Sequence, residues 1–294
     1  MQLLITLADN LETIMTKPPR LSEIGHWSEI KLEIVKKYAE AYSIILSKQD
    51  YLKHIYIDAF AGAGIHISKT SKEIVAGSPL NALNVEPPFK ELHLIDLDGK
   101  KAQFLAGIMR DYSNVFVYQG DCNKILLEKV FPKVRYEDYR RGLCLLDPYG
   151  LHLNWEVLKK AGEMKSLDIF LNFPTMDMNR TALWKNFDAV DEEKIKRMTA
   201  FWGDESWKDI SYSESNQPSL FGLTKKEKES NQTIAESFRK RLQQVAGFKF
   251  VPEPIPMRNS TGATLYYLFF ASHNERADKI ARYILKKYKD TELR

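Results

Sequence analysis

Between residues 53 and 174, short apolar runs alternate with segments of helical periodicity, and this alternation constrains the fold more than any other feature. The apolar runs lie at residues 54–60, 91–98, 115–121, 142–150 and 166–174. Helical patterns, with apolar side chains three or four residues apart, separate these runs. Strands that alternate with helices form βαβ units, in which a parallel sheet carries helices on both faces. The sequence therefore predicts an α/β fold with a doubly wound, mostly parallel sheet.

Outside the alternating region, two segments have a different character. Residues 1–48 predict a loosely attached lead followed by a helix that packs on the core. From residue 175 to residue 231 the alternation stops and the sequence becomes polar and charged, which predicts a helical insertion or lid. We therefore expect residues 49–294 to form one domain that contains this insertion.

The last sixty residues predict one more unit of the sheet. A helix at residues 232–247 is followed by two strand-like runs, 248–258 and 263–272, which flank a turn. Such a pattern is typical of an antiparallel hairpin. A final amphipathic helix at residues 275–289 closes the predicted fold.

Composition and charge narrow the class of protein. Of 294 residues, 44% are hydrophobic and 28% charged, as in an ordinary globular protein with a sizeable core. The formal net charge of +4 permits nucleic-acid binding without arguing for it. Two cysteines, Cys122 and Cys144, lack a C-x-x-C spacing and predict a reducing cytoplasm rather than a disulfide framework. We expect neither a membrane span nor a metal site, because there is no long apolar run and no paired histidine pattern.

The first predicted strand ends in a glycine turn, Tyr-Ile-Asp-Ala-Phe-Ala-Gly-Ala-Gly at residues 56–64. In open α/β sheets, ligands bind at the carboxyl ends of the strands, and glycine lets the backbone approach a ligand closely. Asp58 is placed to accept a hydrogen bond from the ammonium group of a methionine moiety. A tight turn without a ligand is the alternative. The turn residues that we expect to contact a cofactor are Phe60, Ala61, Gly62 and Gly64.

Two phosphate-binding motifs are excluded at this turn. A P-loop needs glycine before Lys-Ser/Thr, but Ser68 precedes Lys69 and Thr70. A dinucleotide-binding turn needs a third glycine, where Ile67 stands. The turn therefore suits a cofactor without phosphates, of which S-adenosylmethionine is the common one.

Acidic residues also follow the second and third predicted strands. A carboxylate at Asp96 matches the two vicinal hydroxyls of a ribose, whereas we assign Asp98 to the N-cap of the next helix. Asp121 is placed to accept from an adenine amino group or, alternatively, to cap the following helix. Leu97 and Cys122, which lie beside these acids, complete the predicted cofactor site.

The fourth predicted strand ends in Asp147-Pro148-Tyr149, which we predict to be the catalytic residues. The Asp147 carboxylate and a nearby carbonyl could accept from an exocyclic amino group and direct its lone pair at a methyl sulfonium, while Tyr149 stacks on the base. A turn that merely closes a buried strand is the alternative. We predict that Asn172 and Arg180, after the fifth strand, contact the substrate.

With these motifs in place, the chain resembles the three-Cys-motif partner protein family (TcmP), Rossmann-like methyltransferases named for an associated protein with a three-cysteine motif. The resemblance runs from residue 27 to the C-terminus. It implies a class I methyltransferase fold, S-adenosylmethionine as cofactor and a three-Cys-motif protein as partner. The residues that carry it are Trp27–Lys31, Tyr56–Gly64, Gly77–Leu80, Gly120–Asn123, Leu146–Leu151, Trp155, Asp168–Pro174 and Met178–Arg180.

Two more distant likenesses bear on the acceptor. The glycine turn Phe60–Gly64 with Gly77–Leu80 is similar to the ribosomal RNA adenine-N6 methyltransferases, whose site has Asp-Pro-Pro-Tyr where this chain has one proline fewer. The run Asp147–Gly150 is also similar to the Asp-Pro-Phe-Gly of tRNA guanine-N2 dimethyltransferases. These likenesses imply methylation of a nucleobase amino group in RNA or DNA. The alternatives are a non-catalytic partner or scaffold protein of a mobile-element or phage-defence system, and an enzyme that methylates a protein or a small molecule.

Overall fold

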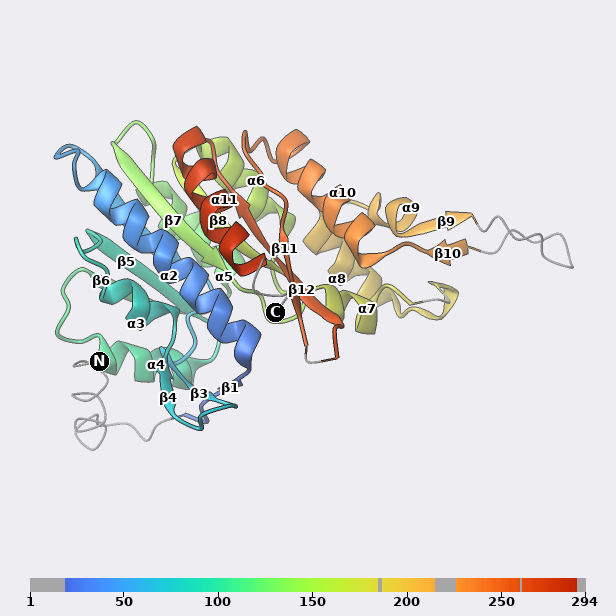
Figure 1. The fold of residues 1–294 in the computed structure, drawn as a ribbon, viewed down its shortest axis with the longest axis horizontal. Helices are drawn as coiled ribbons and strands as arrows, with labels where there is room; N and C mark the ends of the chain where they lie inside the picture. The colour runs from blue at the N-terminus through green and yellow to red at the C-terminus, as the bar shows by residue number, and fades with distance from the viewer. Residues whose placement is uncertain (1–18, 185–186, 215–225, 260, 290–294) are drawn as a thin grey trace, which may run out of the picture.

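A seven-stranded sheet forms the centre of the computed structural model, which describes residues 19–184, 187–214, 226–259 and 261–289 (Figure 1). Five neighbouring strands are parallel, and the last two run antiparallel to their neighbours. The predicted doubly wound sheet with a C-terminal hairpin is thus confirmed. From one edge to the other, the strands are β11 (Ile255–Arg258), β12 (Thr264–Ala271), β8 (Leu167–Phe173), β7 (Arg140–Leu146), β2 (Lys53–Asp58), β5 (Glu91–Asp96) and β6 (Val115–Gln119).

The order of the strands creates a switch point beside β2. The chain moves outward from β2 through β5 to β6 and then returns to pair β7 against the other side of β2. Asp58, the last residue of β2, lies opposite Leu94 of β5 and Leu145 of β7. The loops that follow these three strands therefore start at one edge of the sheet, where ligands bind in open α/β folds.

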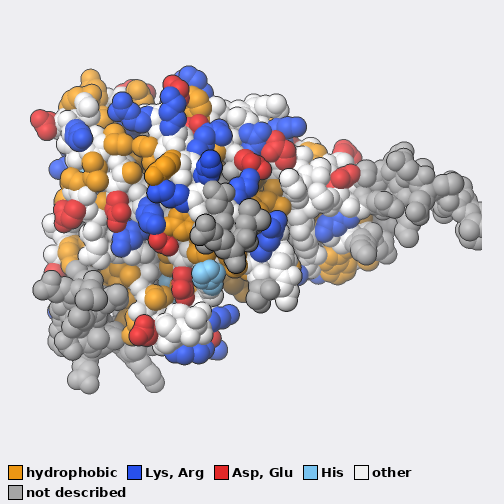
Figure 2. Space-filling model, viewed as in Figure 1, with side chains coloured by type: hydrophobic (Ala, Val, Ile, Leu, Met, Phe, Trp, Pro, Cys, Tyr) orange, Lys and Arg blue, Asp and Glu red, His pale blue; other side chains and the backbone are white. Residues whose placement is uncertain are grey.

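Helices cover both faces of the sheet and close a separate apolar core on each face. The helices of the first face are α2 (His26–Leu46), α3 (Ser78–Leu83), α4 (Gly99–Ile108) and α11 (Glu275–Lys289). The second face carries α5 (Cys122–Ile125), a π-helical turn (Leu126–Val130), a 3-10 turn (Phe131–Lys133), α6 (Trp155–Met164) and α10 (Asn231–Gln244). Figure 2 shows that Lys and Arg side chains, mixed with Asp and Glu, are spread over the outside of the first face.

The predicted first helix, α2, packs one side against the sheet. Ile34, Val35, Tyr38 and Tyr42 are buried, at the spacing that places residues on one helix face. Lys31 is buried on the same side. A lysine among apolar neighbours needs a charged partner, and that partner belongs to the functional site described below. Of the predicted lead before this helix, residues 1–18 lie outside the described part of the chain.

The insertion after β8 is helical, as predicted, and also contains a hairpin that was not. Its helices are α7 (Thr175–Thr181), a 3-10 turn (Phe187–Ala189), α8 (Glu192–Trp202) and α9 (Trp207–Ser211). Trp202 and Trp207 are fully buried and anchor the insertion to the second core. The strands β9 (Tyr212–Glu214) and β10 (Lys226–Lys228) pair antiparallel and extend away from the sheet (Figure 1). Three-residue strands carry too little periodicity to be recognised in a sequence.

A second small sheet contains two strands that lie between β2 and α3 in the sequence, where only a turn was expected, and one strand that precedes α2. Its strands are β1 (Glu23–Ile24), β3 (Ile65–Ser68) and β4 (Ile74–Ala76). Gly77 is the N-cap of α3, and Ser78 is its first helical residue. The side chain of Ser78 acts on Asp58 at the end of β2, where it opposes the rise in pKa that burial causes.

None of the helices within the described ranges is long and apolar enough to cross a membrane. In the same ranges, no group of three or more His, Cys, Asp or Glu side chains is placed to hold a metal ion.

Candidate functional site

The sheet brings the predicted acidic residues together at its carboxyl edge. Asp58 and Asp96 are the last residues of β2 and β5, and Asp147 directly follows β7. The charges of Asp147 and Asp96 both act to raise the pKa of Asp58, which reflects how close the three carboxylates lie. Residues that are 38 and 51 positions apart in sequence thus form one acidic cluster because their strands are neighbours.

The turn after β2 uses its backbone donors within the protein. The N–H groups of Ala59 and Ala61 donate to the carbonyls of Leu145 and Ile95, at 3.0 and 2.8 Å. These bonds tie the turn to β7 and β5. The side chain of Ala61 is buried in the first core, so this predicted cofactor contact is not available through its methyl group.

The two glycines of this turn have different local roles. Gly62 and Gly64 both have positive φ, +63° and +81°, which L side chains rarely adopt. A Cβ at Gly64 would lie 2.8 Å from the side chain of Leu105, so this glycine allows α4 to approach. Space within 4 Å of a Cβ at Gly62 is open among the described residues, so a ligand can reach the backbone there.

Asp58 is fully buried beneath the turn. One carboxylate oxygen accepts from the Phe60 N–H at 3.1 Å, whereas Oδ2 has no hydrogen-bond partner among the described residues. Burial raises the pKa of Asp58 to about 7, and the Ser78 side chain and the Phe60 N–H oppose this rise. An unpaired buried carboxylate oxygen has a high cost unless a donor meets it. Phe60 itself is half-buried against the second core.

Asp96 is held in one orientation by two backbone donors. Its Oδ2 accepts from the Gly62 N–H and its Oδ1 from the Asp98 N–H, both at 2.8 Å. Each oxygen keeps a second lone pair for another donor. The neighbouring Leu97 side chain is 71% exposed beside this carboxylate. Asp98 caps α4 by accepting from the N–H groups of Lys100 and Lys101, as the sequence predicted.

Asp121 caps α5, and the residue that follows Cys122 connects two loops. The Asp121 Oδ1 atom accepts from the backbone and the side chain of Asn123. Asn123 in turn donates to the His152 carbonyl at 3.1 Å and accepts from the Asn154 N–H at 2.7 Å. Asn123 thus fixes the loop after β7, a role that the sequence analysis missed. Cys122, a predicted cofactor contact, directs its side chain into the second core.

Asp147 is held by side chains from two other elements. Its Oδ2 forms an ion pair with the Lys31 ammonium of α2, and its Oδ1 accepts from the Asn172 amide at 2.7 Å. The Lys31 side chain is 8% exposed and that of Asp147 is 29% exposed. Asn172, predicted to bind substrate, therefore acts on Asp147. Its own amide oxygen is buried without a partner among the described residues.

Lys31 is the most informative residue that the sequence analysis did not select. Burial acts to lower the pKa of Lys31, but the charges around it, that of Asp147 foremost, raise it instead. The ammonium also lies 5.4 Å from the centre of the Tyr266 ring, on β12. Lys31 is thus a charged link between α2, the β7 loop and the C-terminal hairpin. Its position on the apolar side of α2 is the sequence feature that could have identified it as a buried lysine.

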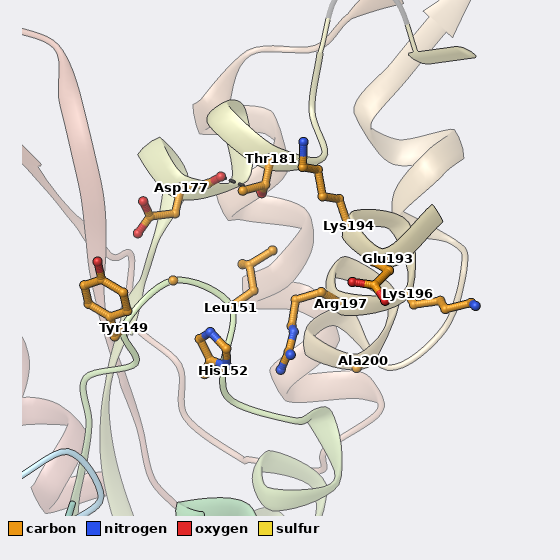
Figure 3. A pocket seen from close by; sticks show the side chains of 11 residues that line it. Tyr149, Leu151, His152, Asp177, Thr181, Glu193, Lys194, Lys196, Arg197 and Ala200 are labelled. Carbon is orange, nitrogen blue, oxygen red and sulfur yellow. Dashed lines mark hydrogen bonds between the residues drawn. The ribbon is translucent and has the colours of Figure 1, made fainter. Parts of the chain in front are cut away.

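Tyr149 is the most exposed residue of the site, at 87% of its surface. Pro148 is buried behind it, and Gly150 after it has positive φ. Tyr149 lines a pocket of about 630 Å³ between the β7 loop and the insertion helices α7 and α8 (Figure 3). Arg180 is exposed on α7, and among the described residues no hydrogen bond or ion pair connects it to Asp147 or Tyr149.

Comparison with known proteins found similarity in structure. No model of a known protein family matches the sequence, and a comparison with curated proteins gives no match. The structure is similar to protein LPL1258 from Legionella pneumophila, of the family model DUF519, with a TM-score of 0.50 and 12% identity over 87% of this chain and 91% of that one. It also matches a putative S-adenosylmethionine-dependent methyltransferase from Listeria monocytogenes, with a TM-score of 0.39 and 14% identity over 81% of this chain and 100% of that one.

At these identities the likeness concerns the fold alone. The strand order, the switch point beside β2 and the antiparallel pair at one edge form the class I, Rossmann-like arrangement that the sequence predicted. The predicted fold class is therefore confirmed, whereas the predicted roles of individual residues stay predictions.

Proposed function

We propose that this chain is an S-adenosylmethionine-dependent methyltransferase that methylates a nucleobase amino group in RNA or DNA. One observation carries the proposal: the carboxylate of Asp147 is fixed between Lys31 and Asn172, two residues before the exposed Tyr149. A fixed acceptor next to an exposed aromatic ring suits a planar amine. Three acidic residues at neighbouring strand ends support a cofactor beside it.

The residues at the end of β2 and β5 fit this cofactor. The unpaired Oδ2 atom of Asp58 is the kind of buried acceptor that an ammonium group satisfies. Asp96 is already oriented by backbone donors and keeps lone pairs for two vicinal hydroxyls. The open space over Gly62 allows a ligand to approach the turn. Leu97 and Asp121 would contact the adenine end.

When bound, the cofactor supplies an electrophilic methyl group on a sulfonium. The protein holds the acceptor amine in position relative to this methyl group. Each oxygen of Asp147 has one lone pair left after its contact with Lys31 or Asn172, so the carboxylate can still accept from the amino group. Tyr149 would stack on the base, which contributes about 1–3 kcal/mol in single-strand binders. Holding two reactants in attack geometry can supply roughly 7–11 kcal/mol of the barrier.

Lys31 would act on the reaction through Asp147. The ion pair would fix the carboxylate in the position where it accepts from the amino group, and the proton that the nitrogen loses after transfer would pass to solvent at the partly exposed Asp147. Asn172 holds the other oxygen. Fixed groups that need no reorganisation are the main contribution of an enzyme to such a step.

The finer assignment rests on the resemblance to the TcmP family. On that basis we propose a three-Cys-motif protein as partner. The two more distant likenesses, to ribosomal RNA adenine-N6 and tRNA guanine-N2 methyltransferases, support adenine N6 or guanine N2 as the methylated atom. The rival proposal is a methyltransferase-like platform without catalysis.

Incubation with cofactor labelled in the methyl group tests the proposal. RNA, DNA and protein fractions from cells that lack the gene are offered separately, and we expect label in a nucleic acid. The Asp147→Asn variant should leave every fraction unlabelled. Label in protein alone would exclude the nucleobase acceptor. Absence of label in all fractions, together with intact function of the Asp147→Asn variant in cells, would favour the platform.

A further inference from the structure

The pocket that Tyr149 lines begins two residues after Asp147 and lies between the loop after β7 and the insertion. One wall is the loop after β7, with Tyr149 and His152, and the other wall is the helix α8. Its volume of about 630 Å³ lies within the range of nucleotide-sized binding sites. A strand whose base occupied the Asp147 site would therefore have its adjoining backbone beside this pocket.

The charged side chains of the pocket come mainly from α8. Lys194, Lys196 and Arg197 face it together with two carboxylates, Asp177 and Glu193 (Figure 3). Cationic groups thus outnumber anionic ones by one.

Lys196 and Arg197 are the cations in this pocket that have no partner. Both are exposed, and neither forms an ion pair with any described residue. Lys194 lies over the ring of Trp184, at 4.8 Å from its centre. Arg197 extends toward His152, and its charge, second to burial, lowers the pKa of that histidine (Figure 3). These positive charges are thus available to an anion from outside.

The other basic surface of the molecule lies over α2 and α11 (Figure 2). Four of its cations pair with acidic neighbours, whereas Arg276 and Lys286 are exposed and form no ion pair with any described residue. The pairs are Lys37–Glu33, Lys279–Glu275, Arg282–Asp278 and Lys289–Glu253. Unpaired cations next to the acceptor site make the α8 pocket the better place for a polyanion.

We infer that the pocket between the β7 loop and α8 binds the sugar-phosphate backbone of a single-stranded nucleic acid next to the acceptor base, an inference that rests on the proposed function. Lys196 and Arg197 contact phosphates, and the carboxylates face sugar or base donors. The strand is single because a base inside a duplex cannot reach Asp147 without leaving its stack. The insertion is accordingly the part of the chain that selects a polynucleotide.

The test measures the affinity of a mixed-sequence oligonucleotide of about 12 nucleotides, the length of strand that such a groove can track. Single-stranded RNA, single-stranded DNA and duplex DNA are compared at several salt concentrations. The variant Lys196→Glu/Arg197→Glu is matched by Arg276→Glu/Lys286→Glu, which reverses two exposed charges on α11. Calorimetry with S-adenosylhomocysteine is carried out on all three proteins.

We expect the α8 reversal to weaken single-strand binding at least tenfold and to reduce the slope of log affinity against log salt by about 1.4, or about 0.7 per phosphate contact. The α11 reversal should change affinity less than twofold, and S-adenosylhomocysteine should bind all three proteins alike. A preference for RNA or DNA in the wild type identifies the source of the strand.

Several outcomes overturn the inference while the proposed cofactor site stands. They are no oligonucleotide binding by the wild type, equal losses in both reversals, tighter binding of duplex than of single strands, and label transfer to protein with no nucleic-acid affinity. If the wild-type protein does not bind S-adenosylhomocysteine, that result would instead overturn the proposed function. If the α8 reversal does not fold, as circular dichroism would show, Lys196→Gln/Arg197→Gln replaces it with an expected loss of at least threefold.

Discussion

The two loops that flank the switch point differ in how they are held and in how far they are exposed to solvent. After β2, the turn donates its N–H groups to the protein itself, and Asp58 is sealed beneath it. After β7, the loop exposes Tyr149, and Asp147 is held by side chains from α2 and β8. Under the proposed function, the first loop would hold one small ligand, whereas the second would meet a large partner from solvent. The difference implies that variants at the two loops affect different steps.

The largest effect is expected at the loop after β7, which we call the open loop because it exposes Tyr149. Asp147→Asn removes the charge that Lys31 binds and turns one of the two acceptor oxygens into an amide donor, while Lys31 and Asn172 both compete for the oxygen that remains. Methyl transfer should therefore fall about 100- to 1000-fold, as when one preorganised hydrogen bond is lost at an active site. S-adenosylhomocysteine affinity should stay within about twofold, since this step belongs to the other loop. Single-turnover kinetics with labelled cofactor provide the measurement. Transfer within tenfold of wild type would remove Asp147 from the reaction.

The loop after β2, which we call the sealed loop because Asp58 is buried beneath it, should affect how stability depends on pH. Burial raises the folded-state pKa of Asp58 to about 7, well above the ordinary value of an aspartate, so the folded protein holds this proton more tightly than the unfolded chain does. The resulting stabilisation is complete below about pH 4 and is lost as the pH rises through 7. Its full size is on the order of 4 kcal/mol. Urea denaturation between pH 5 and pH 8 should therefore show the wild type losing stability that Asp58→Asn does not lose.

Asp168 provides the matched control for that experiment. It is buried at the start of β8, accepts from Ser272 and Tyr38, and has a pKa that burial raises to about 6. Asp168→Asn should remove the lower part of the same pH dependence and leave the part near pH 7. Superimposable pH profiles for wild type and Asp58→Asn would show that Asp58 does not titrate as described.

Lys31→Met should destabilise the fold by about 3 kcal/mol. Removing one partner of a buried pair costs about 3–5 kcal/mol, and Asp147 is partly exposed, which places this variant at the lower end. In the double variant Lys31→Met/Asp147→Asn no charge is left unpaired, so most of the stability should return while activity does not. Thermal denaturation and transfer assays on the same samples separate the two. A single variant as stable as wild type would show that the ion pair contributes little.

The smallest effect is expected at Asn123, which fixes the open loop from behind. Asn123→Ala leaves the Asn154 N–H without its acceptor and should cost about 1–2 kcal/mol of unfolding free energy. It should also lower kcat, because the loop that carries Tyr149 loses its anchor. Asn114→Ala, which removes a bond of 3.1 Å to the Phe89 carbonyl at the start of β5, should lose similar stability without loss of kcat. Equal kcat values for the two variants would contradict this role.

The same comparison explains what the sequence could predict. Continuous apolar runs revealed the five parallel strands, because strands buried on both faces need apolar side chains throughout. Spacing then placed Asp58, Asp96 and Asp147 at strand ends, which is where the structure has them. The sealed loop was therefore largely predictable from local pattern.

The open loop was not, because its partners are distant in sequence. Lys31 meets Asp147 across 116 positions, so its position on the apolar side of α2 indicates burial but not its partner. Asn123 contacts a loop about thirty residues later. Short strands such as β9 and β10 depend on pairing rather than periodicity. Contacts of this kind are fixed by topology and become visible only with the fold.

Calorimetric titration with S-adenosylhomocysteine tests the central claim most directly. We expect the wild-type protein to bind with one-to-one stoichiometry and Asp96→Ala to lose at least tenfold in affinity, because the variant removes the acceptor for both ribose hydroxyls. Asp98→Ala, which removes only the cap of α4, should bind like wild type. Absence of binding, or binding that Asp96→Ala leaves unchanged, would contradict a cofactor site at the carboxyl edge of this sheet.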